Sequence, residues 1–266
     1  MSIYQNHRLI MESNKLRLDI SRAAYVELNA SWKYKKNASA YFTRVYFVTE
    51  GEADVLCDNR PYKLQAGNIY IIPAGTPFCY DCKQRLCKLY FQVNLYSSMG
   101  EDLPIAPKGC IVLEHRAEEI RQTVELFYKK DFQSALAVRQ RVEQVLLEAM
   151  QADTLPIPHY SAPIRKTLRR MGETPSMAMT VEVLADGVHL SPAAFQKRFK
   201  DEVGISPIRY LRRRVVAAVE KDLKTTELSL REIAEKYGFC DQFHLSRVFT
   251  AYTGISPSKY RKSGMF

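Results

Sequence analysis

The sequence predicts two domains: an N-terminal all-β barrel followed by two helices, and a C-terminal all-α domain in which a long helix joins two helix-turn-helix units. Three observations support this fold class. The 266 residues suffice for two domains. Short apolar segments separated by turn residues fill the first part of the chain, and a phrase near the C-terminus is repeated. The repeat is the most informative of the three, because it defines a structural unit.

This repeat is nine residues long, and its two copies lie 50 residues apart. Gly204–Arg212 (GISPIRYLR) returns as Gly254–Lys262 (GISPSKYRK). Large apolar residues precede both copies at the same offsets: Phe195 and Phe199 before the first, and Leu245 and Phe249 before the second. An internal repeat of this length indicates one supersecondary unit built twice.

Each copy carries the start and stop signals of a helix. Ser191 and Asp241 are N-cap residues, and Gly204 and Gly254 stand where a helix C-terminus needs positive φ. The segments between these signals are therefore predicted to be helices.

A shorter helix is predicted before each of them. Ser229 and Glu232 form a capping box, and Thr180 is the corresponding cap in the first copy. Each copy is therefore a helix-turn-helix candidate, and a long helix over about Pro207–Lys224 joins the two.

The second helix of each unit has an apolar face and an opposite face suited to reading DNA. The outward positions are Ala193, Gln196, Lys197 and Lys200 in the first unit, and Gln242, Phe243, Ser246, Arg247 and Thr250 in the second. In a major groove, Gln pairs with adenine, Arg pairs with guanine, and an exposed Phe packs on a thymine methyl group. Each residue taken singly also fits a solvated helix face. Two copies of this polar face in one basic domain favour DNA binding.

Positive charge is concentrated in the repeat region. Residues 156–266 carry 19 Lys and Arg against 11 Asp and Glu, which leaves 20 against 18 in the first 155 residues. This asymmetry is what binding to a phosphate backbone requires.

The segment Ile233–Phe249, with Gly254–Pro257 and the Tyr260-Arg261 pair, resembles the signature of AraC/XylS-type transcription regulators. The resemblance covers residues 160–266 and implies two recognition helices that enter successive major grooves of double-stranded DNA. The base-reading positions that it implies are Ala193, Gln196, Lys197, Gln242, Phe243, Ser246 and Arg247. Ala193 and Phe243 are apolar where family members are often polar. The resemblance favours transcription activation, with repression as the alternative that the sequence leaves open, and RNA polymerase is a candidate protein partner.

The N-terminal region is predicted to consist of strands and turns. Strand segments are expected at 15–30, 41–48, 53–57, 62–64, 68–72 and 89–95. Glu50–Glu52 is predicted to turn one strand into the next. Many short strands between Gly, Asn, Asp and Pro turns favour a sandwich or a small barrel.

The spacing of Gly67, Pro73, Gly75 and Phe78 resembles the second motif of cupin (jelly-roll) barrels. By this resemblance Phe78 replaces the last metal-binding histidine, and Arg44 replaces the metal-binding glutamate. The other two metal positions fall on Ala38 and Ala40, or on Asn37 and Ser39. None of these residues is a metal ligand, so neither a metal nor a cofactor is expected. What remains is a barrel with a hollow, which suits one small-molecule effector.

Three residues are expected to contact that effector: Arg44, Phe78 and Trp32. An arginine inside a barrel needs a carboxylate or a ligand that carries oxygen atoms. An aromatic wall beside the guanidinium suits a sugar or a small carboxylate. A register shift of one residue would instead turn Arg44 toward solvent.

Residues 114–152 predict two helices, because their apolar residues recur at helical spacing. One face should pack on the barrel, and the remaining apolar surface equally supports a homodimer seam. The domains expected are therefore 1–152 for sensing and dimerisation, 153–163 as a proline-rich linker, and 164–266 for DNA binding.

The chain shows neither a signal peptide nor an apolar run long enough for a membrane span, so a cytoplasmic protein is expected. Six cysteines are present, and Cys79, Cys82 and Cys87 are closely spaced. A zinc site would need a second matched pair, so reduced thiols are expected, with a redox role as the alternative.

Three functions fit these observations. The first is a ligand-responsive transcription regulator without enzymatic activity. The second is a cupin-type enzyme with an appended DNA-binding module, which the lost metal positions disfavour. The third is an architectural DNA-binding protein that responds to no ligand.

Overall fold

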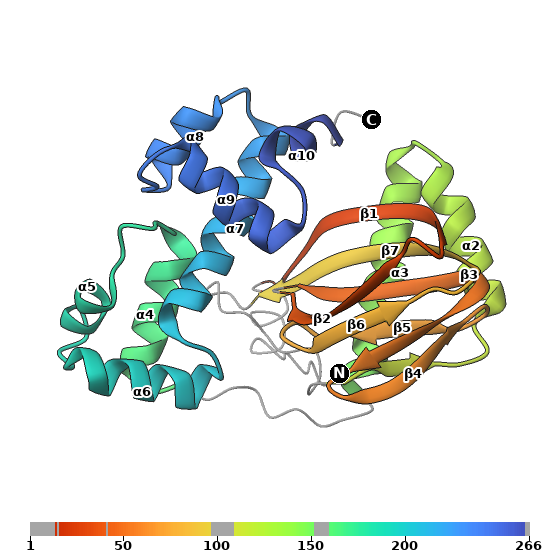
Figure 1. The fold of residues 1–266 in the computed structure, drawn as a ribbon, viewed down its shortest axis with the longest axis horizontal. Helices are drawn as coiled ribbons and strands as arrows, with labels where there is room; N and C mark the ends of the chain where they lie inside the picture. Colours follow the sequence, from red (N-terminus) through yellow and green to blue (C-terminus); the bar gives the residue numbers. More distant parts are fainter. Residues whose placement is uncertain (1–13, 15, 41, 97–108, 152–159, 264–266) are drawn as a thin grey trace, which may run out of the picture. The chain divides into compact units, whose positions relative to one another are not determined.

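The computed structural model describes residues 14, 16–40, 42–96, 109–151 and 160–263 (Figure 1). They fall into two compact units. One contains Arg17–Leu95 and the two helices that follow, and the other contains the described residues from Tyr160 onward. The linker predicted over 153–163 lies mostly outside the described residues. Its last two residues, Ala162 and Pro163, already belong to a helix, because the N-cap of that helix is Ser161.

The first unit is rich in β-structure, as the sequence predicts. The described strands are β1 Arg17–Asn29, β2 Lys33–Ser39, β3 Thr43–Cys57, β4 Arg60–Gln65, β5 Ile69–Ile72, β6 Pro77–Asp81, β7 Arg85–Tyr96 and β8 Ile111–Leu113. One layer has the order β1-β7-β3-β5-β8. In the other, β2 pairs with β6, and β6 and β4 pair with β3. Strand β3 therefore runs through both layers: its first half pairs with β5 and its second half with β4 and β6.

The turn predicted at Glu50–Glu52 is wrong, because β3 continues through these residues. Gly51 has a φ of 71°, and the pairing of β3 with β7 shifts register between Val48 and Glu50. A Cβ atom at Gly51 would lie 2.0 Å from the carbonyl oxygen of Arg85, so only glycine fits. The glycine produces a bulge that bends one strand between two layers, and not a hairpin.

Three of the strands, β2, β6 and β8, were not expected from the sequence. β2 is mostly polar, β6 begins with Pro77, and β8 has only three residues. Strands β2 and β6 pair with each other and β8 pairs with β5. Pairing with a neighbour, rather than local propensity, therefore makes these segments strands.

Side chains of β3 alternate between two apolar clusters. Val45 and Phe47 belong to the cluster that the helices cover. Tyr46 and Val48 belong to the other cluster, which gathers residues of both layers and which we call the inner cluster. Arg44 lies on the same face of β3 as Tyr46, because alternate residues of a strand share a face.

Two helices, α2 (Ala117–Tyr128) and α3 (Phe132–Gln151), follow the strands and lie along the sheet (Figure 1). Ile120 of α2 and Val142 and Val145 of α3 are buried in the cluster with Val45 and Phe47. The expectation that one face of these helices packs on the strands is confirmed.

The second unit is all helical, as predicted. Its described helices are α4 Ala162–Glu173, α5 Val181–Asp186, α6 Pro192–Val203, α7 Pro207–Thr225, α8 Leu230–Lys236, α9 Gln242–Thr253 and α10 Pro257–Ser263. The pairs α5–α6 and α8–α9 are the two helix-turn-helix units, and α7 joins them (Figure 1). Gly204 and Gly254 end α6 and α9 with φ values of 80° and 79°, which confirms their role as left-handed caps.

None of the helices that the structure describes is both long and apolar enough to cross a membrane.

Candidate DNA interface and sensor site

Local caps set where the two exposed helices, α6 and α9, begin. Ser191 Oγ accepts a hydrogen bond from the Ala194 amide at 3.3 Å, and Asp241 Oδ1 accepts one from the His244 amide at 2.6 Å. A complete capping box also starts α8. These bonds satisfy amides that have no partner within the helix, so the sequence determines the helix starts locally.

Repeated tyrosines hold each of these helices against the helix that follows it. The ring of Phe199 in α6 packs against Tyr210 of α7, with centroids 5.8 Å apart. The ring of Phe249 in α9 packs in the same way against Tyr260 of α10, at 5.3 Å. All four side chains are buried. The repeated phrase thus encodes the same anchor twice, and each anchor leaves the opposite face of its helix free.

The nine residues predicted to face DNA all lie on α6 and α9. The exposed ones are Ala193, Gln196, Lys197, Lys200, Gln242, Phe243, Arg247 and Thr250. Phe243 is 69% exposed, so its ring is accessible to a partner. Ser246 is only half-exposed, and its hydroxyl donates to the Gln242 carbonyl at 2.8 Å. Any contact of Ser246 with DNA would therefore have to share a hydroxyl already bonded within the helix.

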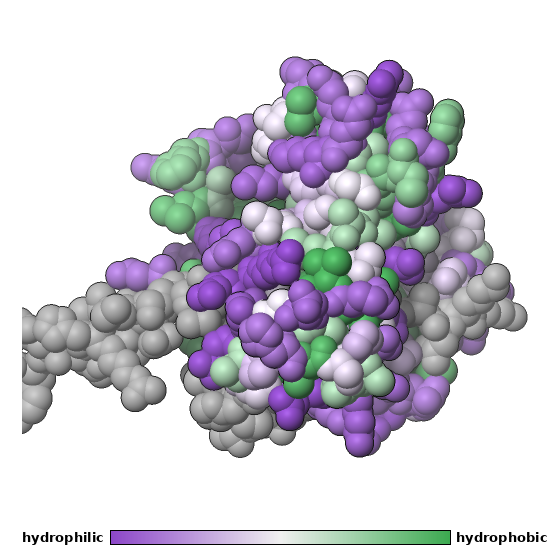
Figure 2. Space-filling model, turned by 90° about the vertical axis from the view of Figure 1, so that its left-hand side faces the viewer, coloured by the Kyte–Doolittle hydropathy of each residue, from purple (hydrophilic) through white to green (hydrophobic). Residues whose placement is uncertain are grey.

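On the face that carries α5, α6 and α8, hydrophilic side chains predominate and hydrophobic ones are interspersed among them (Figure 2). Lys197, Arg198 and Lys200 place exposed positive charge on α6, whereas the exposed Arg231 of α8 is ion-paired with Glu235 at 3.1 Å. A hydrophilic, positively charged surface of this kind suits contact with phosphate groups.

A buried polar group that the sequence analysis missed ties α7 to α8. The Asp222 carboxylate accepts hydrogen bonds from Lys236 Nζ at 2.7 Å and from the Tyr237 hydroxyl at 2.9 Å. Burial, followed by the bond to Asp222, raises the pKa of Tyr237. The available signal was an acidic residue within the apolar stripe of α7, between Val219 and Leu223.

In the first unit, Arg44 and Phe78 meet at the inner cluster. Arg44 Cζ lies 4.9 Å from the centroid of the Phe78 ring and 5.2 Å from that of Phe42. Arg44 Nη1 is buried and has no hydrogen-bond partner in the described part of the chain. The guanidinium therefore points inward and makes cation–π contacts in place of an ion pair.

Trp32 also lies at this cluster, within a ladder of stacked rings. Its ring is 4.1 Å from that of Tyr80, which in turn stacks on Tyr34 at 5.8 Å. The Tyr80 ring also contacts Phe78, at 5.4 Å. The structure thus brings the three residues predicted to bind an effector into one continuous cluster, although they come from distant parts of the chain.

Lys88 completes the cluster and was missed by sequence reasoning. It lies opposite Val48 in the β3–β7 pairing and is only 3% exposed. Its Nζ atom lies 3.4 Å from the centroid of the Tyr46 ring and 4.1 Å from that of Trp32. Alternation along β7, in which Lys88 shares a face with buried Leu86, was the signal that could have revealed it.

No acidic side chain compensates this charge among the residues described. Burial, and next the neighbouring Arg44 guanidinium, hold the pKa of Lys88 well below its usual range, and only the Cys82 thiol opposes them. Asp81 of the adjoining strand β6 pairs with Lys33, at 3.6 Å. The inner cluster is therefore a largely aromatic environment with two cationic side chains and no counter-ion of its own.

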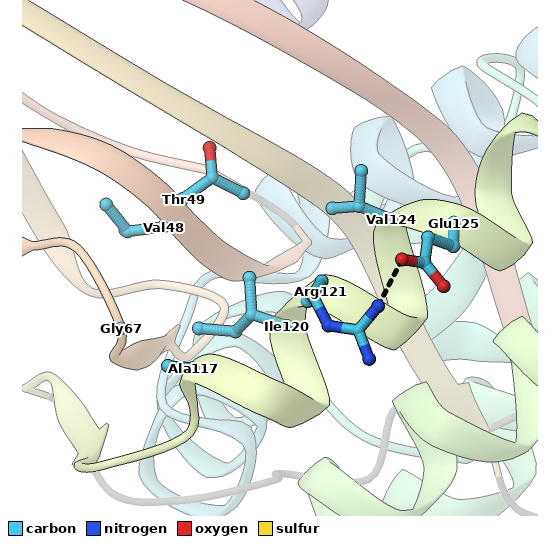
Figure 3. A pocket seen from close by; sticks show the side chains of 8 residues that line it. All are labelled: Val48, Thr49, Gly67, Ala117, Ile120, Arg121, Val124 and Glu125. Atoms are coloured by element: carbon cyan, nitrogen blue, oxygen red, sulfur yellow. Dashed lines mark hydrogen bonds and ion pairs between the residues drawn. The ribbon is translucent and has the colours of Figure 1, made fainter.

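A separate apolar pocket of about 270 Å³ lies between β3 and α2 (Figure 3). Val48, Ile120 and Val124 contribute aliphatic side chains to it, and Arg121, ion-paired with Glu125, lies at its edge. It is somewhat smaller than most ligand pockets. Its charged groups already neutralise each other, so it is a weaker ligand candidate than the inner cluster.

The cysteines are free thiols. Cys110 and Cys57 are close enough for a thiol–thiol hydrogen bond, which with burial raises the pKa of Cys110. No group of three or more potential metal ligands occurs among the described residues.

The class of protein follows from this geometry. Two helix-turn-helix units, each with an exposed polar helix and joined by one helix, define a DNA-binding protein with a separate β-rich domain.

Comparison with known proteins shows which proteins this chain resembles. Residues 184–263 match the family model of a helix-turn-helix domain. The chain is 24% identical over 247 residues to the raffinose operon transcriptional regulatory protein RafR of Pediococcus pentosaceus, covering 88% of this chain and 89% of that protein. It is 28% identical over 122 residues to the arabinose operon regulatory protein of Escherichia coli, covering 45% and 42%. A solved structure of ToxT from Vibrio cholerae has the same fold, with a TM-score of 0.59 and 9% identity over 93% of this chain and 98% of that one. In its helix-turn-helix region this chain is therefore similar to AraC/XylS-type transcription regulators.

Proposed function

We propose that this regulator reads two successive major-groove segments of DNA and that a small molecule bound in its β-rich domain controls it. The observation that carries the proposal is the repeated anchor of α6 and α9, which leaves one equivalent face exposed on each helix. Residues 164–266 act as the DNA-binding domain, and α4 opens it.

Base recognition is assigned to the outer faces of α6 and α9. Gln196 and Arg247 are exposed and chemically suited to adenine and guanine. Phe243 offers an apolar ring to a thymine methyl group. The remaining DNA contacts are Ala193, Lys197, Lys200, Gln242, Ser246 and Thr250.

Effector recognition is assigned to the inner cluster. Arg44, Phe78 and Trp32 are supported by one arrangement: a guanidinium without a carboxylate, set beside stacked aromatic rings. A buried donor without a partner is costly, and a ligand with oxygen atoms would remove that cost. A sugar or a small carboxylate meets this requirement.

Dimerisation is assigned to α2 and α3. Four large apolar side chains there remain exposed although the opposite face is buried: Tyr128, Phe132, Leu136 and Leu147. Phe132 is 83% exposed, and Leu136 lies one helical turn further along α3. A second copy of the chain would cover these side chains, and it would place two DNA-binding domains on one operator.

Selection of bound sequences from a random DNA library by the full chain tests the proposal. Two preferred segments about one helical turn apart are expected. The selection is repeated in the presence of sugars and of small carboxylates, one of which should change the affinity. A single contiguous segment, or no preferred sequence, would contradict the bipartite assignment. Sequence-specific binding that no barrel ligand alters would contradict ligand control.

A further inference from the structure

Two cationic side chains share the inner cluster, and neither has an acidic partner in the described part of the chain. Lys88 Nζ lies over the faces of the Tyr46 and Trp32 rings, 3.4 Å and 4.1 Å from their centroids. Arg44 contacts the rings of Phe42 and Phe78 and has a buried nitrogen without a partner. A buried cation of this kind is costly unless an anion joins it.

The surrounding charges indicate that the anion does not come from the neighbouring strands. Asp81 pairs with Lys33, and Asp54 pairs with Lys83 at 3.1 Å, all on partly exposed side chains. Glu52 pairs with Lys63 at 2.8 Å, again near solvent. The acidic residues closest along β3 and β6 are thus engaged elsewhere.

We infer that the effector is a small organic acid, whose carboxylate pairs with Lys88 in the positive field of Arg44 and whose apolar body packs among the rings of Trp32, Tyr46 and Tyr80. This inference rests on the proposed function, because it names the effector class of that same site. It selects a carboxylate over a neutral sugar, because only an anion stabilises the protonated form of Lys88 and offsets the positive charge of Arg44.

The aromatic ladder explains how such an acid could enter. Lys88 itself is almost fully buried, whereas Trp32 and Tyr80 are half-exposed and Tyr34 is exposed. Rings that stack on one another can stack instead on a planar or apolar ligand with little loss of contact. The stacked rings are therefore the part of the site that can move aside for a ligand, and strands β3 and β7 are the part that stays in place.

Binding of the acid should be coupled to uptake of a proton. In the empty site, burial and then Arg44 hold the pKa of Lys88 below its usual range. Tyr46, whose ring Lys88 contacts, and Cys82 are neutral at neutral pH, as are Tyr80 and Tyr90, which interact with Tyr46. A carboxylate beside Lys88 favours the protonated amine, so the bound acid raises this pKa. The affinity should accordingly increase as the pH falls, down to the pKa of the acid itself.

The first test needs no ligand and compares the full-length variants Lys88→Met and Lys33→Met. Lys33 is a matched control, because it is an exposed lysine near the same cluster and is ion-paired with Asp81. Without ligand at neutral pH, Lys88→Met should raise the melting temperature of the β-rich domain, and Lys33→Met should leave it unchanged or slightly lower. A lower melting temperature for Lys88→Met would assign the lysine a stabilising structural role and overturn the inference.

The second test uses benzoate, hexanoate and octanoate, each beside its neutral primary amide. At least one acid should raise the melting temperature of the wild-type chain, and its amide should not. Titration calorimetry in two buffers of different ionisation enthalpy should show proton uptake. Lys88→Met should weaken binding at least about tenfold, or about 1.4 kcal/mol, while Lys33→Met should not.

Equal responses to acid and amide, an undiminished response of Lys88→Met, or no response to any acid would overturn the inference. A neutral sugar that binds at Phe78 without depending on Lys88 would also overturn this inference, but it would leave the proposed function intact. Conversely, an acid that binds through Lys88 but leaves DNA affinity unaltered would support the site and contradict its regulatory role.

Discussion

The glycine that ends α9 offers a test in which backbone strain can be separated from packing. Gly254 has φ and ψ of 79° and −4°, in the left-handed region. A Cβ atom added there would meet no atom within 4 Å. Substitution at Gly254 therefore changes backbone energy without creating a clash, and its effect can be attributed to φ alone.

The magnitude follows from two opposing terms. A left-handed conformation costs an L-residue about 1–2 kcal/mol. Replacing glycine also reduces the freedom of the unfolded chain, which offsets about 0.4–1 kcal/mol. Gly254→Ala should thus lower the free energy of unfolding by about 1 kcal/mol or less. Gly254→Val should lower it by about 2 kcal/mol, because a β-branched side chain resists positive φ more strongly.

Thermal unfolding of the full chain, followed by far-UV circular dichroism, measures the effect on the helical domain. For a domain of about 100 residues, 1 kcal/mol corresponds to about 4–8 °C in melting temperature. Gly254→Val should therefore melt about 8–16 °C below the wild type. Gly254→Asn should lose less, because asparagine tolerates the left-handed region.

A glycine in ordinary helical conformation serves as the control. Gly187 has a φ of −59°, and an added Cβ would come within 3.2 Å only of the flexible end of Arg170. Gly187→Ala should raise the melting temperature by about 2–8 °C, because it gains the same unfolded-state term without the cost of positive φ. Equal melting temperatures for Gly254→Val and the wild type would refute the strain argument.

Four further outcomes are expected. Arg247→Ala should weaken binding to the selected site by about 1–3 kcal/mol and relax the preference at one base pair. Gln196→Ala should act similarly in the other segment. If a mobility-shift titration showed equal losses on random DNA, the two side chains would be phosphate contacts instead of base contacts. Inserting about five base pairs between the two segments should abolish simultaneous contact, because half a turn rotates one segment to the opposite face; an unchanged dissociation constant would argue against two recognition helices. Ser229→Ala should lower the melting temperature of the helical domain, because it removes the N-cap hydrogen bond to the Glu232 amide, which contributes about 1 kcal/mol. A melting temperature equal to that of the wild type would show that the cap is dispensable. Gly51→Ala should unfold the β-rich domain more severely than any Gly254 variant, since its Cβ would collide with the Arg85 carbonyl; circular dichroism showing intact strands would contradict the bulge assignment.

Much of the helical domain could be predicted because its signals act over a few residues. Asp241 caps its own helix and Gly254 ends it, so neither needs a distant partner. The resemblance to AraC/XylS-type regulators rested on the same local phrase. The DNA-contacting side chains remain predictions, since their exposure is compatible with contact but does not demonstrate it. The buried bond between Asp222 and Tyr237 could not be foreseen, because it depends on how α7 and α8 pack.

The β-rich domain was predicted in class but not in its connections. Its apolar segments indicated strands, yet the same glycine signal at Gly51 fits either a turn or a bulge. The approach of the Arg85 carbonyl decided between them, and that contact joins residues far apart in the chain. Strands β2, β6 and β8 likewise exist through pairing rather than through propensity.

The sequence by itself determined the class of the protein, its two helix-turn-helix units and the absence of metal-ligand residues at the expected barrel positions. Only the tertiary structure decided that Arg44, Phe78 and Trp32 share one cluster and that Lys88 joins them without a carboxylate. The physical reason is the distance along the chain over which each interaction acts. Caps and helix faces follow from neighbours within a turn or two, whereas burial and loss of a counter-ion depend on every strand that packs around a side chain.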